Sequence, residues 1–140
     1  LRHTMKANFE GAVNVWKVVQ PHLAPQANMV VVSSQLATRG SPHGADYAAS
    51  KAALSTWARS LALAVGPEGK RVNVLAPGYV DTDILAGDSD EKRNQRIQEV
   101  PLKRIGTGED MASIVSFLLS DDAAYITGSV LHANGGLYLP

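Results

Sequence analysis

Tyr47 and Lys51 are the two residues of this sequence whose spacing most directly suggests chemistry. They lie four positions apart within Ala45 to Val65, an alanine-rich segment that predicts a helix. In a helix such a pair shares one face, one turn apart, and a neighbouring ammonium favours the phenolate form of a tyrosine. The pair could therefore hold a phenol that gives and takes a proton near neutral pH. The spacing alone also fits a solvated surface pair.

Ser34, with Ser33 before it, stands where a short strand from Asn28 to Ser34 is predicted to end. The run from Met29 to Val32 is β-branched without alternation, which is typical of a strand buried on both faces of a parallel sheet. Ligands of open parallel sheets bind beyond the carboxyl ends of the strands, so Ser34 could hydrogen-bond a substrate oxygen. A serine that simply leaves a strand and begins a turn is an equally good interpretation.

Pro77 and Gly78 follow a second predicted strand, Arg71 to Leu75. Proline removes a donor and glycine removes a side chain, so a flat ligand could approach the backbone closely there. Thr82 adds a hydroxyl shortly afterwards, although a plain turn is the commoner meaning of Pro-Gly. Asn8 lies inside the first predicted helix, where it is either exposed or buried with partners that satisfy its amide.

The elements that must position these residues alternate between helix and strand. The polar stretch from Tyr79 to Gly106 suits a mobile flap rather than core. Alternation of this kind predicts a parallel sheet with right-handed crossovers, and three strands are about half of a usual doubly wound sheet. The predicted helices are His3 to Leu23, Ala45 to Val65, Asp90 to Val100 and Thr107 to Ser120, and the third strand is Gly128 to Ala133.

Composition narrows the classes of function. The chain has 140 residues, enough for one domain, and 13 basic residues balance 13 acidic ones. No long basic run interleaves with aromatic residues, and no apolar stretch reaches the roughly 18 residues of a bilayer span, so we expect neither nucleic acid nor membrane as a partner. The absence of cysteine excludes disulfides and thiolate–zinc sites and fits a cytoplasmic location. No metal site is expected, since the four histidines show no ligand spacing.

Taken together, the motifs resemble those of the short-chain dehydrogenase/reductase family. Ser34 precedes Tyr47 by thirteen residues, the usual interval in that family. Further ordered matches occur along essentially the whole chain, so coincidence is a poor explanation. The matching strings are Val32-Ser33-Ser34, Tyr47-Ala48-Ala49-Ser50-Lys51, Asn73-Val74-Leu75-Ala76-Pro77-Gly78, Pro101-Leu102-Lys103-Arg104-Ile105-Gly106 and Tyr125-Ile126-Thr127-Gly128.

The resemblance implies a Rossmann-like, doubly wound parallel α/β sheet, of which residues 1–140 would form the C-terminal catalytic half. In the family, the glycine-rich phosphate loop and the ribose-reading residue lie upstream of this region, and no G-x-G-x-x-G follows a strand here. The chain is therefore expected to be cut from a longer enzyme, or to be completed by another chain. The cofactor could be NAD or NADP.

The resemblance also implies roles for individual residues. Tyr47 would give a proton to a carbonyl oxygen or take one from an alcohol. Lys51 would assist Tyr47 and bind the nicotinamide ribose, Ser34 would hold the substrate oxygen, and Asn8 would support a water relay to the lysine. Val80 would meet the nicotinamide carboxamide through its backbone and Thr82 would meet it through its hydroxyl. The implied cofactor-binding residues are Tyr47, Lys51, Pro77, Gly78, Val80 and Thr82.

Within the family, the C-terminal residues look most like those of 3-oxoacyl-acyl carrier protein reductases. The expected substrate is a small carbonyl or alcohol compound, selected by the flap from Ile84 to Val100, and the expected assembly is a homodimer or homotetramer. Arg59, Lys70 and Arg71 could grip an acidic carrier protein, although Glu68 lies among them and ordinary surface charge explains them equally well. The rival hypothesis is a truncated, non-catalytic chain that keeps only the family's assembly surfaces.

Overall fold

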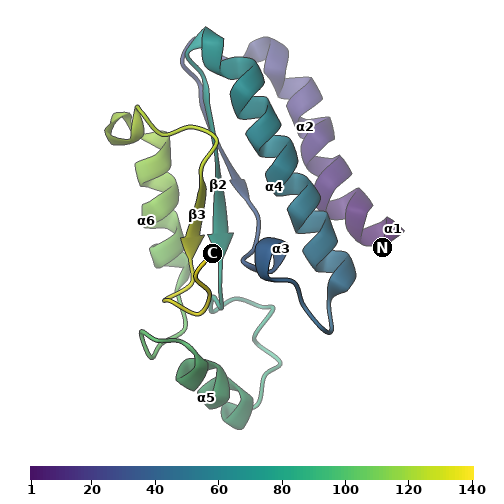
Figure 1. Cartoon of the computed structure of the whole chain (residues 1–140), viewed down its shortest axis with the longest axis vertical. Coiled ribbons are helices and arrows are strands. Elements are labelled where there is room, and N and C mark those ends of the chain that lie inside the picture. Colours follow the sequence, from purple (N-terminus) through teal and green to yellow (C-terminus); the bar gives the residue numbers. More distant parts are fainter.

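The computed structural model describes all 140 residues as three parallel strands with helices on both faces of the sheet (Figure 1). The strand order is β1 (Asn28–Val32), β2 (Arg71–Pro77) and β3 (Val130–Ala133), so β2 is central. In register, Val32 of β1 lies opposite Leu75, and Leu75 lies opposite Leu131 of β3. Residues 71 to 76 are all buried because both faces of β2 are covered. The predicted parallel α/β sheet is confirmed.

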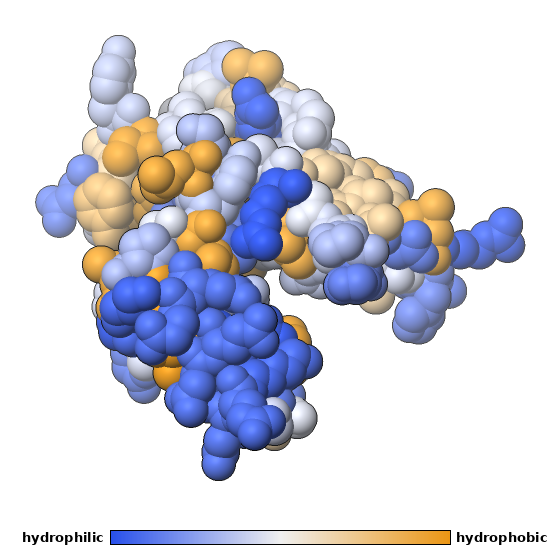
Figure 2. Space-filling view, turned by 60° about the horizontal axis from the view of Figure 1, so that its bottom comes forward, coloured by the Kyte–Doolittle hydropathy of each residue, from blue (hydrophilic) through white to orange (hydrophobic).

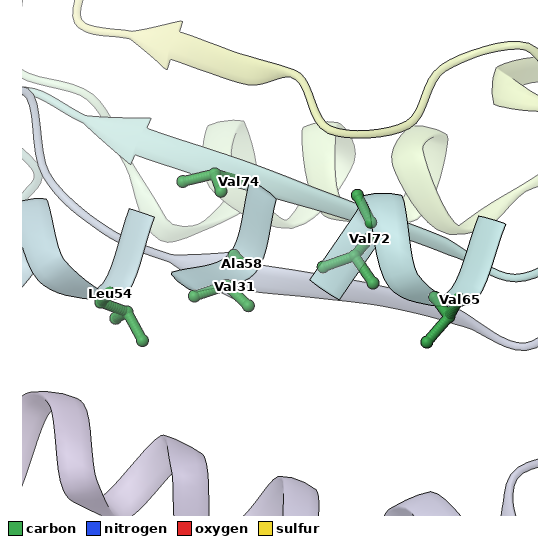
Figure 3. Close-up of a cluster of buried hydrophobic side chains, with 7 residues drawn as sticks. Val31, Leu54, Ala58, Val65, Val72 and Val74 are labelled. Atoms are coloured by element: carbon green, nitrogen blue, oxygen red, sulfur yellow. The ribbon is translucent and has the colours of Figure 1, made fainter. Parts of the chain in front are cut away.

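The long helix α4 (Ala45–Val65) covers one face of the sheet and supplies four of the seven residues in the hydrophobic core cluster (Figure 3). Its Leu54, Ala58 and Val65 form one buried cluster with Val31, Val72 and Val74 of the strands. Ala58 and Val74 are both completely buried. Because alanine side chains are small, α4 can approach the sheet closely.

The N-terminal segment lies along α4 as one continuous rod that contains an irregular turn (Figure 1). It comprises α1 (Arg2–Met5), the π-helical turn η1 (Lys6–Glu10), α2 (Gly11–Val19) and the 3₁₀ turn η2 (Gln20–His22). An unbroken α-helix was the expectation, so the widened turn, in which the Gly11 amide donates to the Lys6 carbonyl, is a difference. Phe9 packs edge-on against Trp57 of α4, with ring centroids 6.3 Å apart.

Helix α6 (Gly108–Leu119) covers the opposite face of the sheet. Thr107 and Asp110 form a capping box, in which the side chain of each residue accepts from the backbone amide of the other. The 3₁₀ turn η4 (Asp121–Ala123) follows α6 and leads towards β3, and a second 3₁₀ turn, η3 (Gly66–Glu68), follows α4.

Arg71 is the first residue of β2 and lies against the carboxyl end of α6. It is buried, with 9% of its surface exposed. Its guanidinium donates to the carbonyls of Leu118, Ser120 and Ile126. The hypothesis that Arg71 grips an acidic partner is therefore wrong, because its charge caps the carboxyl end of α6 inside the molecule.

Two short helices complete the fold. Helix α5 (Asp90–Glu99) lies in the polar stretch between β2 and α6, where the sequence predicted it. Helix α3 (Leu36–Arg39) is one turn long and was not predicted, since four residues give no readable period. No helix combines the length and the apolar composition that crossing a membrane requires.

Candidate active site

The predicted catalytic residues gather where β1 and β2 end. Backbone pairing continues beyond the last residue of β1, because the Ser33 amide donates to the Leu75 carbonyl at 2.7 Å and the Gln35 amide donates to the Pro77 carbonyl at 2.9 Å. Strand β2 itself extends two residues beyond its predicted end at Leu75, and β1 ends two residues before its predicted end at Ser34. Ser34 is thus held rigidly at the carboxyl edge of the sheet.

Ser34 and its neighbour Ser33 have different surroundings, which the sequence did not separate. The Ser34 hydroxyl oxygen accepts from the Leu36 amide at 3.2 Å, at the start of α3, and keeps its own hydrogen for another acceptor. Ser33 donates instead to the Lys51 carbonyl at 3.0 Å, with the Ser55 hydroxyl 2.7 Å away. Ser33 therefore joins β1 to α4 at the level of Lys51, and Ser34 is the serine available to a ligand.

Lys51 and Tyr47 converge as their helical spacing predicted. The Lys51 ammonium donates to the Val32 carbonyl at 3.0 Å and lies 5.8 Å from the centre of the Tyr47 ring. Val32 is 51% exposed, so this bond crosses the open edge of β1. Burial lowers the pKa of Lys51, because a partly buried ammonium loses hydration. The arrangement places a positive charge beside a phenol at the same edge of the sheet as Ser34.

Asn8 occupies the π-helical turn and faces α4. Its side-chain amide donates to the Ser50 hydroxyl at 3.0 Å, and that hydroxyl donates to the Tyr47 carbonyl at 2.7 Å. Ser50 is completely buried. Asn8 therefore acts on the backbone at Tyr47 through a residue that sequence reasoning did not single out. The only signal for Ser50 in the sequence was its place between Tyr47 and Lys51 in the string that matches the family.

The loop after β2 forms the other side of the site. Gly78 donates its amide to the Ala133 carbonyl at 2.9 Å, and a β-carbon there would lie 2.6 Å from that of Asn134, so only glycine fits. Val80 forms an isolated parallel bridge with Gly106. The Thr82 hydroxyl turns back towards the Val80 carbonyl, 3.4 Å away. This loop is therefore held by neighbours far away in the sequence.

The surface at this end of the molecule is hollowed. Figure 2 shows a notch between a hydrophilic lobe, where Figure 1 places α5, and the rest of the molecule. A cavity of about 390 Å³ is lined among others by Tyr79, Met111 and Asn134. None of the predicted catalytic residues lines that cavity. No three or more histidine, aspartate or glutamate side chains gather as a metal ion would require.

The parallel sheet thus has Ser34 just beyond the end of β1, and α4 brings the Lys51 ammonium to the last carbonyl of β1 with the Tyr47 ring 5.8 Å away. A family model described as enoyl-(acyl carrier protein) reductase matches residues 1–138. The chain belongs to this family of short-chain dehydrogenases/reductases.

Individual relatives agree with this assignment. The 3-oxoacyl-[acyl-carrier-protein] reductase FabG of Escherichia coli is 43% identical over 111 residues, which cover 79% of this chain and 46% of that protein. Its counterpart in Haemophilus influenzae is 39% identical over 139 residues, covering 99% and 50%. A short-chain dehydrogenase/reductase structure from Brucella melitensis has a TM-score of 0.90 at 31% identity, covering 95% of this chain and 54% of its own. The chain spans about half the length of the curated relatives it matches.

Proposed function

We propose that residues 1–140 form the catalytic half of an NAD(P)-dependent oxidoreductase that interconverts a carbonyl compound and an alcohol, with Tyr47 as acid and base. The observation that carries this proposal is the position of the Lys51 ammonium. It is bonded to the Val32 carbonyl and lies 5.8 Å from the Tyr47 ring, next to the strand end that bears Ser34. A cation, a phenol and a free hydroxyl so placed suit proton transfer to an oxygen bound between them.

In the reducing direction, the substrate oxygen accepts hydrogen bonds from the hydroxyls of Ser34 and Tyr47. Tyr47 gives its proton to that oxygen as negative charge develops there, and the positive charge of Lys51 stabilises the phenolate that remains. A bound nicotinamide cofactor supplies the hydride. In the oxidising direction, Tyr47 takes the proton of the alcohol and Ser34 holds the same oxygen.

Asn8 has a supporting role in this proposal. Through Ser50 it fixes the backbone carbonyl of Tyr47, which restricts the first turn of α4 and therefore the position of the phenol. Because only its amide nitrogen is engaged in that bond, its side-chain oxygen can accept from the water relay to Lys51 that the family resemblance implies.

The residues present suit the nicotinamide and ribose end of a dinucleotide. Lys51 offers an ammonium to ribose hydroxyls, and Val80 and Thr82 offer a backbone group and a hydroxyl to the carboxamide. Gly78, directly after Pro77 at the end of β2, has no side chain, and the close approach of Asn134 leaves no room for one. Both NAD and NADP satisfy these contacts, because the two differ at the far ribose.

A 3-oxoacyl thioester is the substrate we favour, since the relatives named above are 3-oxoacyl-[acyl-carrier-protein] reductases. Of the three basic residues considered for a carrier protein, Arg59 on α4 is exposed, whereas Lys70 pairs with Glu68 and is 15% exposed. We propose a homodimer or homotetramer as the assembly. The exposed apolar side chains of Val15, Val18 and Leu63 on α2 and α4 support it.

The substitution Tyr47→Phe in the complete protein tests the function. The Tyr47 hydroxyl has no hydrogen-bond partner within the chain, so its loss should leave the free energy of unfolding within about 0.5 kcal/mol. Turnover of a 3-oxoacyl thioester, followed by NADH or NADPH consumption, should fall by about 100-fold or more. Circular dichroism provides the control for folding. Wild-type turnover by a folded Tyr47→Phe variant would refute the assignment of Tyr47 as acid and base.

The second candidate function is a non-catalytic interaction module. The open edge of β1, where Val32 is half exposed, and the apolar side chains on α2 and α4 favour it. Fluorescence titration of the 140-residue chain with NADH and NADPH distinguishes the two. Enhancement that saturates supports the enzyme, and its absence at every protein concentration supports the module.

A further inference from the structure

We propose that Arg93 of α5 and Asp81 of the loop after β2 form a positioning pair. Through this pair, α5 and the nicotinamide-contacting loop move as one unit. This inference rests on the proposed function, because it takes Val80 and Thr82 as the residues that meet the nicotinamide. Neither Arg93 nor Asp81 is among the residues proposed to touch the reacting atoms. They act through the backbone between Tyr79 and Thr82.

The pair is bidentate. One guanidinium nitrogen of Arg93 donates to an Asp81 carboxylate oxygen at 3.0 Å, and a second donates to the other oxygen at 2.6 Å. Two parallel bonds fix orientation as well as distance. Twelve positions separate the two residues, so the contact joins a helix to a loop rather than two turns of one helix.

Helix α5 depends on such polar contacts because it has no buried residue. Figure 2 shows the lobe that contains it as almost uniformly hydrophilic. Its other two charge contacts towards Asp88, from Lys92 and Arg96, reach only the segment that leads into the helix itself. Arg93 is therefore the cation of α5 whose ion pair is with the loop after β2.

Tyr79 makes a second connection on the same side. Its hydroxyl donates to Glu99 at 3.0 Å, and Arg96 lies over its ring, 4.5 Å from the centre. Tyr79 and Asp81 both contact α5, and Val80 lies between them in the chain, with its backbone in a bridge to Gly106.

Displacement of α5 therefore pulls on the alternate residues of the loop that presents Val80. Figure 1 places α5 at the end of the molecule towards which β2 runs, and Figure 2 shows a notch beside the hydrophilic lobe there. A nucleotide that orders the loop must also favour one position of α5, and the reverse holds by linkage. Substrate entry past α5 and nucleotide binding at the loop are thereby coupled.

The test uses Arg93→Gln, Asp81→Asn and their combination in the complete protein. Hydrogen exchange of the backbone amides from Tyr79 to Thr82 is measured without nucleotide and with NADH or NADPH, and dissociation constants are measured by fluorescence. Each single variant should speed exchange in the loop and weaken nucleotide binding by about two- to fivefold. The double variant should be no worse than either one, because both substitutions remove the same contact.

Lys92→Gln is the matched control, since it removes the neighbouring cation of α5 and an ion pair that does not reach the loop. It should leave exchange in the loop and nucleotide affinity at wild-type values. The exchanged pair, Asp81→Arg with Arg93→Asp, should recover part of the lost protection, which a general loss of helix stability would not allow.

The inference is wrong if Arg93→Gln speeds exchange in α5 alone, or if the effects of the two single variants add in the double variant. The exchange measurement without nucleotide does not require catalysis. If the wild-type protein binds neither NADH nor NADPH, the proposed function fails, yet exchange in the loop still decides whether Arg93 holds it.

Discussion

Replacing Lys51 by methionine should remove most of the turnover while leaving the fold intact. The Lys51 ammonium lies 5.8 Å from the centre of the Tyr47 ring, over which a phenolate spreads its charge. At that distance and an effective dielectric constant of about 20, Coulomb's law gives about 3 kcal/mol of attraction. Each 1.4 kcal/mol is about a factor of ten in rate, so turnover should fall by about 100-fold.

The same substitution should cost little stability. The one hydrogen bond of the Lys51 side chain is to the carbonyl of Val32, at the edge of the sheet, where water can replace the ammonium. The lowered pKa of Lys51 shows that burial already disfavours its charge. Methionine keeps the length and apolar stem of the side chain, so the urea midpoint should stay close to that of the wild type.

The assay is single-turnover consumption of NADH or NADPH with a 3-oxoacyl thioester, with urea unfolding measured on the same samples. Lys92→Met is the control, because it removes an exposed cation of α5 away from Tyr47. Lys51→Arg keeps the charge and should retain more activity than Lys51→Met. If Lys51→Met turned over within about threefold of the wild type, the electrostatic role of Lys51 would be untenable.

Two further predictions concern stability. Arg71→Met leaves the carbonyls of Leu118 and Ser120 without their side-chain donor, whereas the Ile126 carbonyl still accepts from Asn73 at 2.8 Å. Each unpaired carbonyl costs about 1–3 kcal/mol, so the free energy of unfolding in urea should fall by at least about 2 kcal/mol, and exposed Arg59→Met should change it by less than about 0.5 kcal/mol. A loss below about 1 kcal/mol for Arg71→Met would contradict this cap. Arg104 and the Thr107 amide hold the pKa of Asp110 well below its usual range. The stability that these two contacts give the folded protein is therefore present at pH values above the ordinary carboxyl pKa. It is lost as the pH falls through the depressed pKa of Asp110. Asp110→Asn and Arg104→Gln should therefore both flatten the decline of the urea midpoint below about pH 4, and an unchanged decline would be inconsistent with this pairing.

The parts of the site that depend on neighbours in sequence could be predicted from the sequence. Tyr47 and Lys51 meet because a helix places residues four apart on one face, whatever surrounds it. The capping box of Thr107 and Asp110 is likewise a matter of three-residue spacing. Alternation of buried strands with amphipathic helices similarly allows few topologies other than a parallel sheet.

The parts that depend on distant segments could not be predicted in this way. Arg71 reads as a surface cation in sequence, yet the end of α6, at least 47 positions later, surrounds it with carbonyls. Ser33 and Ser34 are the same residue type at adjacent positions, so the sequence does not distinguish them. Only the packing of α4 makes Ser33 a structural residue and leaves the Ser34 hydroxyl free to bind. The pairing of Asp81 with Arg93 also requires α5 to fold back over the loop.

Sequence by itself determined the chemistry available to this protein, because residue types and short spacings set which groups share a helical face or a strand end. Only the tertiary structure decided which of those groups are free. Hydrogen bonds and burial are made between segments that are far apart in the chain, and no local period encodes which carbonyl or carboxylate a given donor will meet.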